Sequence, residues 1–275
     1  YDIEGRNDVE ECINNMSTSH KELWKRNIEN TEYTIIESDG ENVEHYSPSS
    51  GVVNLFNTSS ADTLFHETSH AIDENIVTLN YRSSRKEKRF GEWKEKKSFE
   101  TQFKGASNTA SELYNINRQE NYNKDISALY NWIGIKHDGA TPLVEHDEIT
   151  KAIRQSIENF KGKYGKEVAT NLSDMIDAAT YGEHPLVFLT GGHGKDYWTD
   201  DTKAFKELWA EVSSLKALGH NEALEEISKI LPERYKAINT VHEAVYDGKT
   251  YKNVIRNEND RRIQEEIWEI TVNSI

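Results

Sequence analysis

The chain has 275 residues, enough to bury a substantial hydrophobic core as one large domain or two small ones. Its 33 Lys and Arg residues and 48 Asp and Glu residues give a formal charge of −15. This balance argues against a nucleic-acid-binding protein, because duplex binding needs a basic surface to replace phosphate counterions, and it disfavours anionic membrane surfaces. Aromatic residues make up 10% of the chain, too many for a disordered protein.

The cysteine content and the termini narrow the class further. Cys12 is the only cysteine, which excludes an internal disulfide and a cysteine-rich zinc site. No apolar run approaches the roughly 18 residues that a membrane-spanning helix needs. The chain begins at Tyr1, with neither Met nor the apolar core of a secretory signal, so we expect a mature product or an excised domain.

The first 60 residues predict short helices followed by a small sheet. Apolar residues at helical spacing over 8–30 predict one or two short helices. The runs 33–36 and 52–56 are rich in β-branched and aromatic residues and predict two strands. Turn-forming residues at 38–42 and 47–51 separate them, so we expect a hairpin or a small sheet.

The middle of the chain has a different composition. The stretch from Arg82 to Lys97 is densely charged and locally basic, and we interpret it as a solvated helical or mobile insertion rather than a binding patch. Residues 111–180 predict several helices interrupted at glycines. With no internal repeat or convincing linker, we expect a single domain over 1–275 in which 80–170 is a largely helical insertion.

The last third predicts a loop and then helices. The Gly- and Pro-rich segment 182–194 predicts a loop that contains a short strand at 186–189. Helices are expected at about 202–218, 222–230 and 233–245.

One motif carries a specific chemistry. His66-Glu67-Thr68-Ser69-His70 is an H-E-x-x-H sequence in a helix that we expect to begin near Ala61, capped by Ser59 or Ser60. Residues four apart share a helix face, so both imidazoles can face one metal ion while Glu67 faces a water molecule. With this composition, the motif arises by chance in roughly one chain in twenty-five. The alternative is a pair of surface histidines beside an incidental Glu.

A catalytic zinc needs a third protein ligand and an open position for water. The pattern H-E-x-x-H-x-x-G-x-x-H is excluded, because its last two fixed positions are Asp73 and Ile76. Glu207 and Glu211 lie four apart in an amphipathic segment, so one could bind the metal while the other holds a ligand histidine by a hydrogen bond. An ordinary solvated helix face is the alternative.

Several blocks of sequence resemble known metallopeptidases. LFHETSHAIDE at 64–74 and FKELWAEVS at 205–213 resemble the catalytic domain of anthrax lethal factor and its relatives, which are zinc metallopeptidases. A closer resemblance is to zincin-like domains attached to phage minor head (head morphogenesis) proteins. It adds the blocks YSPSSG at 46–51, GHGKDYW at 192–198 and LPERY at 231–235.

The resemblance covers roughly residues 43–76 and 172–240, with the blocks in matching order, whereas 80–170 matches nothing familiar. Two positions depart from the family patterns. Ser69 stands where a Gly often precedes the second His, and Lys203 stands where the phage-type domains often have an acidic residue. Neither departure removes a proposed ligand.

The resemblance implies an α+β zincin-like fold, with a small twisted sheet over the H-E-x-x-H helix and a mostly helical C-terminal half. It implies one Zn²⁺ ion held by His66, His70 and Glu207, the first Glu of an E-x-x-x-E pair. Glu211 would then hold a ligand histidine by a hydrogen bond. Asp73 could also orient a ligand, although a capping or core role is more frequent for such a residue.

The resemblance also implies a mechanism. Glu67 would take a proton from a zinc-activated water that attacks a peptide carbonyl, and would then deliver it to the leaving amine. Tyr197 is the first choice for the group that stabilises the carbonyl oxygen, and His193 is the competitor. The strand at 52–56 would act as an edge strand that pairs with extended substrate.

We therefore predict a zinc-dependent endopeptidase that acts on a protein or peptide, with no nucleic-acid or membrane partner. Its setting would be phage-associated or that of a toxin-like effector, so we expect it to be secreted, virion-associated or delivered into a target cell. The alternative is a non-catalytic structural or interaction module of a phage particle that retains the fold. Metal-dependent hydrolysis of a non-peptide substrate ranks last.

Overall fold

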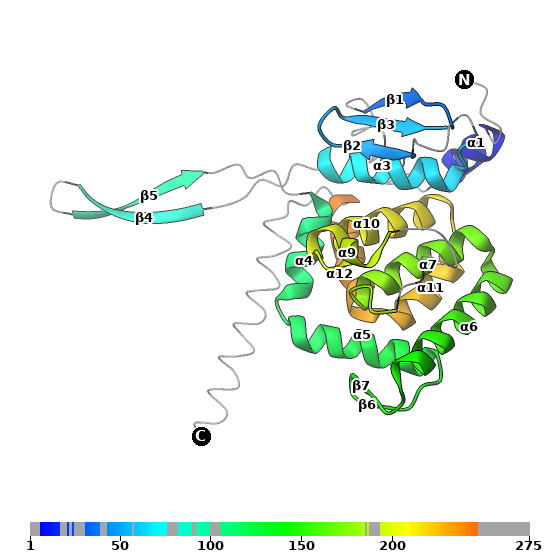
Figure 1. The fold of residues 1–275 in the computed structure, drawn as a ribbon. Coiled ribbons are helices and arrows are strands. Elements are labelled where there is room, and N and C mark those ends of the chain that lie inside the picture. The colour runs from blue at the N-terminus through cyan, green and yellow to red at the C-terminus, as the bar shows by residue number, and fades with distance from the viewer. Residues whose placement is uncertain are drawn as a thin grey trace.

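The computed structural model describes residues 6–16, 21, 24, 31–38, 43–56, 58–75, 82–89, 92–99, 105–184, 186 and 193–246. These residues form an α+β protein, mostly helical with a small sheet, as expected. A three-stranded sheet lies on one side of helix α3, and a body of packed helices lies on the other side (Figure 1).

The small sheet has the strand order β1-β3-β2. Strand β1 (Glu32–Ile35) runs parallel to β3 (Val52–Leu55), and β2 (His45–Ser47) runs antiparallel to it. Val53 and Leu55 are fully buried and pack with Ala71 of α3. Our expectation of an edge strand at 52–56 was wrong. The apolar residues of β3 need cover, and pairing on both sides makes it the central strand, which leaves β1 and β2 as the edges.

Helix α3 (Ala61–Asn75) begins where the sequence predicts. The hydroxyl of Ser60 accepts a hydrogen bond from the backbone N–H of Thr63 at 3.2 Å, which confirms Ser60 as the capping residue. One face of α3 packs on the sheet, and the opposite face packs on α10 (Asp201–Ala217). The two predicted metal-binding segments are therefore on adjacent helices.

The helical body shares one hydrophobic core, which includes Trp198, Phe205 and Trp209. The expected C-terminal helices are confirmed as α10, α11 (Asn221–Ile230) and α12 (Pro232–Tyr246). The remaining elements of the body are α4 (Ala106–Asn115), α5 (Arg118–Trp132), β6 (His137–Asp138), β7 (Thr141–Pro142), α6 (His146–Tyr164), α7 (Lys166–Ala179) and the single turn α9 (Lys195–Trp198). Helices α4 to α6 contribute residues to the same core.

At the N-terminal end, α1 (Arg6–Asn15) confirms a short helix in the first segment. The strand expected at 186–189 lies outside the described residues, except for Leu186, which belongs to no strand. Among the helices that the structure describes, none is both long enough and apolar enough to cross a bilayer.

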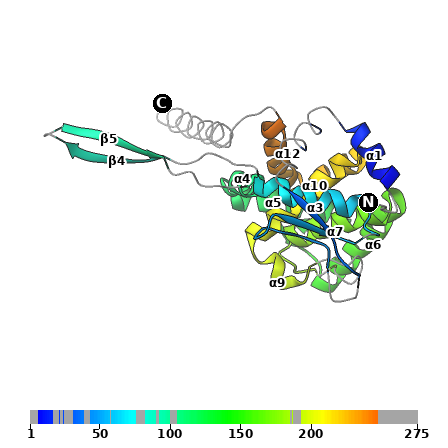
Figure 2. The same ribbon diagram turned by 90° about the horizontal axis from the view of Figure 1, so that it is seen from above.

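The charged segment expected to be helical or mobile is instead a β-hairpin. Strands β4 (Arg82–Arg89) and β5 (Glu92–Phe99) pair antiparallel over their whole length. The hairpin extends away from the helical body in both views (Figures 1 and 2). Gly91 lies between the two strands in the sequence, and a glycine there disfavours a continuous helix.

Candidate metal centre

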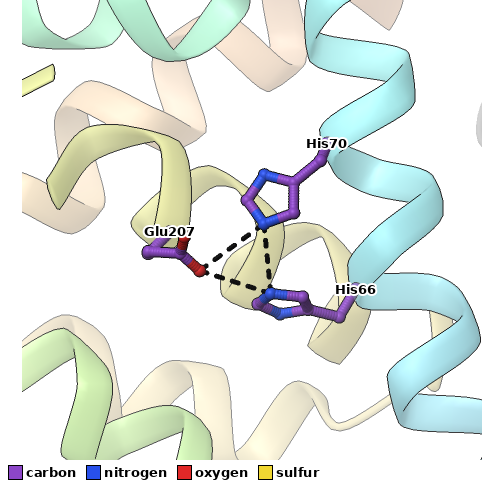
Figure 3. A group of neighbouring side chains, drawn as sticks. All are labelled: His66, His70 and Glu207. Atoms are coloured by element: carbon purple, nitrogen blue, oxygen red, sulfur yellow. Dashed lines mark hydrogen bonds and ion pairs between the residues drawn. The ribbon is translucent and has the colours of Figure 1, made fainter. Parts of the chain in front are cut away.

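The facing sides of α3 and α10 bring the three predicted ligands together (Figure 3). Residues His66 and His70 lie one helical turn apart, and their Nε2 atoms are 3.2 Å apart. The Oε2 atom of Glu207 lies 3.3 Å from the first Nε2 and 3.5 Å from the second. The two imidazoles and the carboxylate thus form a nearly equilateral triangle of donor atoms.

The triangle has dimensions that suit a tetrahedral metal ion. Ligand atoms about 2.0–2.1 Å from a tetrahedral ion lie about 3.3–3.4 Å from one another, close to the separations observed. Two imidazoles and one carboxylate are also a common donor set for catalytic zinc, with a fourth position left for water. His66, His70 and Glu207 could therefore hold a metal ion.

The second oxygen of Glu207, Oε1, contacts two other side chains. The Tyr197 phenol donates a hydrogen bond to Oε1, and the Nε2 atom of His193 lies 3.5 Å from the same oxygen. The rings of these two residues stack at 3.7 Å with an interplanar angle of 9°. Both candidates for stabilising a carbonyl oxygen are thus at the site, and both contact Glu207.

A carboxylate also contacts the other ring nitrogen of His66. Its Nδ1 atom lies 3.4 Å from Oε1 of Glu211, which is one turn along α10 from Glu207. A carboxylate at Nδ1 keeps a proton on that nitrogen, so Nε2 is the atom that would face a metal ion. Glu211 is 3% exposed, and its second oxygen has no hydrogen-bond partner among the described residues.

The electrostatics favour a cation at this place. Burial alone would lower the pKa of His66, but the carboxylates of Glu211 and Glu207 hold this pKa well above its usual value. Burial alone would raise the pKa of Glu207, but the neighbouring imidazoles, first that of His70, hold it well below its usual range. Burial raises the pKa of Asp174 on α7, and the carboxylates of Glu211 and Glu207 raise it further. Two buried acidic side chains, those of Glu207 and Glu211, thus contact the imidazoles directly.

The expected general base, Glu67, lies on the sheet side of α3. Its Oε2 atom accepts a hydrogen bond from the backbone N–H of Tyr46 at 2.7 Å. Tyr46 belongs to β2, so this bond brings the edge of the sheet beside the H-E-x-x-H motif. The same helix is held to β1 by a hydrogen bond of 3.1 Å between the hydroxyls of Tyr33 and Thr68.

The structure gives Asp73 a capping role. Its Oδ1 atom accepts from the backbone N–H of Ser107 at 2.7 Å, and its Oδ2 atom accepts from the Ser107 hydroxyl at 2.5 Å. Both oxygens thus serve the first turn of α4. Asp177 likewise lies away from the ligands, and accepts from the backbone N–H of Leu186 at 3.2 Å.

Two residues that the sequence analysis missed hold the ligand helices in register. The indole of Trp209 on α10 donates to the carbonyl of Ser69 at 3.1 Å, across 140 positions of sequence. The Ser69 hydroxyl donates to the carbonyl of Phe65 at 2.6 Å, so its hydrogen-bonding capacity is satisfied within α3. Asp62 accepts from the Ser214 hydroxyl at 2.7 Å and adds a second bond between α3 and α10. The sequence signal for the Trp209 contact was a tryptophan between the two glutamates of the E-x-x-x-E pair.

The fold and this geometry define an α+β protein with a candidate metal centre between two core helices. Comparison with protein-family models, with curated proteins and with solved structures gives no match for the chain. The functional argument therefore depends on the residues of the site.

Proposed function

We propose that the chain is a zinc-dependent endopeptidase. The observation that carries the proposal is the triangle of His66 Nε2, His70 Nε2 and Glu207 Oε2, with sides of 3.2, 3.3 and 3.5 Å. Its support is twofold: the donor set leaves a position for water, and the motif places a carboxylate, Glu67, next to the first ligand. A site that only stabilises the fold would more often be closed by four protein ligands.

The chemistry follows from the side chains around the centre. When bound, zinc would supply Lewis-acid activation of water and of a peptide carbonyl. Glu67 would accept the proton that the attacking water loses and pass it to the leaving nitrogen. Tyr197 or His193 would donate a hydrogen bond to the carbonyl oxygen as it gains negative charge, after releasing the contact with Glu207.

The substrate strand would lie along β2. This strand is an edge of the sheet, and the Tyr46–Glu67 hydrogen bond brings it beside the expected base. An extended peptide can add to such an edge through main-chain hydrogen bonds, which positions one peptide bond at the metal centre. β2 therefore takes the role that the sequence had suggested for 52–56.

The decisive experiment compares the wild-type chain with Glu67→Gln. Both proteins should contain about one equivalent of zinc, because Glu67 is not a proposed ligand. New N-termini should appear in a proteome incubated with wild type, and their rate of formation should fall by about 10²- to 10⁴-fold with Glu67→Gln. Glu74→Gln on the same helix is the matched control, since Glu74 pairs with Lys206 at 2.5 Å and should leave both measurements unchanged.

The same experiment addresses the alternatives. Cleavage retained by Glu67→Gln would remove Glu67 as the base. Stoichiometric zinc with no cleavage of any protein would favour a non-catalytic module. Zinc content unchanged by His66→Ala would place the metal elsewhere. A phage-associated or toxin-like setting is compatible with the proposed reaction, and identification of cleaved proteins would distinguish the two.

A further inference from the structure

The β4–β5 hairpin carries a charge opposite to that of the rest of the chain. Residues 82–99 contain eight Lys or Arg residues and three Glu residues, an excess of five positive charges. Because the whole chain has a formal charge of −15, the other residues together carry −20. The hairpin extends away from the body in Figures 1 and 2. This separation of charge concentrates a positive potential on the hairpin.

The strand register places this charge unevenly along the hairpin. In the half that includes the loop, Lys86 is opposite Glu95, Glu87 is opposite Lys94, and Arg89 is opposite Glu92, so charges there largely compensate. In the other half, the four cations have no opposing acid. They are Arg82, Arg85, Lys96 and Lys97, and the rest of that half consists of Ser83, Ser84, Ser98 and Phe99.

One register pair is unfavourable by itself. Arg85 is directly opposite Lys96, and like charges opposite each other destabilise an antiparallel pair. An isolated two-stranded hairpin is at best marginally stable in water. An anionic partner between these two positions would remove the repulsion and stabilise the hairpin.

The backbone of the hairpin offers a second means of recognition. Among the described strands, β4 and β5 pair only with each other, so each presents an outer edge of N–H and C=O groups. Eight residues of strand span about 26 Å. A polypeptide can pair with such an edge through its own main chain, whereas a nucleic acid or a lipid cannot.

We propose that the β4–β5 hairpin binds an extended acidic segment of another protein, by strand addition at one edge and by charge at Arg82, Arg85, Lys96 and Lys97. For the endopeptidase, this segment would belong to the substrate, and that assignment alone depends on the proposed function. The hairpin would then select acidic proteins at a distance from the metal centre. The acidic body disfavours a duplex nucleic acid, whose charge density is far higher than that of a peptide.

Binding of a fluorescent dodecapeptide of glutamate to the full-length, zinc-loaded Glu67→Gln protein tests the proposal, because this background blocks cleavage. A glutamine dodecapeptide, a twelve-nucleotide single-stranded DNA and phosphatidylserine vesicles serve as competing probes. The glutamate peptide should bind best, and its affinity should decrease as salt rises. The variants are Lys96→Glu and the double variant Arg85→Glu/Lys96→Glu.

The single variant separates binding from hairpin stability. Lys96→Glu places opposite charges at the Arg85 register pair, so it should stabilise the hairpin while weakening peptide binding by about tenfold. The double variant should weaken it further. Lys151→Glu/Lys166→Glu, two exposed positions on the body, matches the change in net charge and should alter the affinity less than about twofold.

Any of three results would overturn the proposal. The first is equal binding of the glutamate and glutamine peptides, and the second is an equal loss of peptide affinity in the hairpin and body variants. The third is tighter hairpin-dependent binding of DNA or vesicles than of the glutamate peptide. Cleavage by wild type without selective peptide binding would refute the docking surface and leave the endopeptidase intact. Hairpin-dependent binding without cleavage of any protein would support the docking surface and refute the endopeptidase.

Discussion

The Tyr197 phenol donates a hydrogen bond to Oε1 of Glu207, while Oε2 of the same carboxylate faces the imidazoles of His66 and His70. One oxygen is thus held by a neighbouring side chain, and the other is directed at the candidate metal position. Burial, followed by the charge of Glu207, raises the pKa of Tyr197 far above its usual value, so the phenol remains a donor.

Tyr197→Phe should therefore lower zinc affinity by about 10- to 100-fold, the usual effect of removing a group that orients a ligand. Competition with a chromophoric chelator measures this. Tyr164→Phe is the control, because that hydroxyl bonds Glu226 at 2.9 Å, away from the site. Unchanged affinity together with lost cleavage would instead assign Tyr197 to the carbonyl oxygen alone.

Gly105 is required by the close approach of α4 to Asp73. A Cβ atom at Gly105 would lie 2.6 Å from Oδ1 of Asp73 and 2.9 Å from its backbone oxygen. Gly105→Ala should cost about 1–3 kcal/mol in the free energy of unfolding, because the cap must move. Gly162→Ala in α6 has open space and should stabilise the protein by up to about 1 kcal/mol. Urea denaturation checks both, and similar effects of the two substitutions would contradict the steric argument.

Arg234 and Asp125 form a buried charge pair between α12 and α5. Each side chain is 1% exposed, and Arg234 Nε lies 3.8 Å from Asp125 Oδ2. Burial raises the pKa of Asp125 to about 6, although Arg234 opposes this shift. Arg234→Met leaves a buried carboxylate without its cation and should cost about 3–5 kcal/mol.

A double-mutant cycle tests this pair. Arg234→Met/Asp125→Asn should cost clearly less than the sum of the two single substitutions, because no unpaired charge remains. Urea unfolding of the four proteins at one pH gives the coupling free energy. Additive costs would mean that the two side chains do not stabilise each other.

His184 should make the protein less stable in acid. Burial, together with the charge of His146, lowers the pKa of His184 to about 4. Its folded pKa lies below the unfolded value of about 6.5, so the unfolded chain binds the proton more strongly. The contribution of neutral His184 is therefore complete above pH 6.5 and is lost as the pH falls toward 4, at no more than about 1.4 kcal/mol per pH unit.

His184→Phe isolates this effect, since Phe retains a ring beside His146, which stacks at 4.4 Å, and cannot titrate. The comparison with wild type is necessary because Asp177 also titrates. Burial raises the pKa of Asp177 to about 7, so this residue makes the folded protein more stable as the pH falls. The difference in unfolding free energy between the two proteins should narrow or reverse from pH 7 to pH 4.5. A constant difference would exclude His184 as the titrating group.

Local sequence features predicted a helix or strand well wherever the feature depends on that one element alone. The Ser60 cap, the start of α3 and the three C-terminal helices depend on short-range spacing, and all are confirmed. The hairpin at 82–99 was missed because a charged, Lys-rich stretch has no apolar periodicity to distinguish strand from helix.

The sequence by itself determined that His66 and His70 face one side of a helix, because residues four apart in a helix share a face in any context. Spacing alone left Glu207 and Glu211 both open as the third ligand. Only the packing of α10 against α3, fixed in part by the bond from Trp209 to Ser69, directs Glu207 at both Nε2 atoms and Glu211 at Nδ1 of His66. The tertiary structure also decided that β3 is central and β2 is the edge beside Glu67. Both outcomes depend on how distant surfaces fit together, and the free energy of that fit is a sum over many contacts that no local spacing encodes.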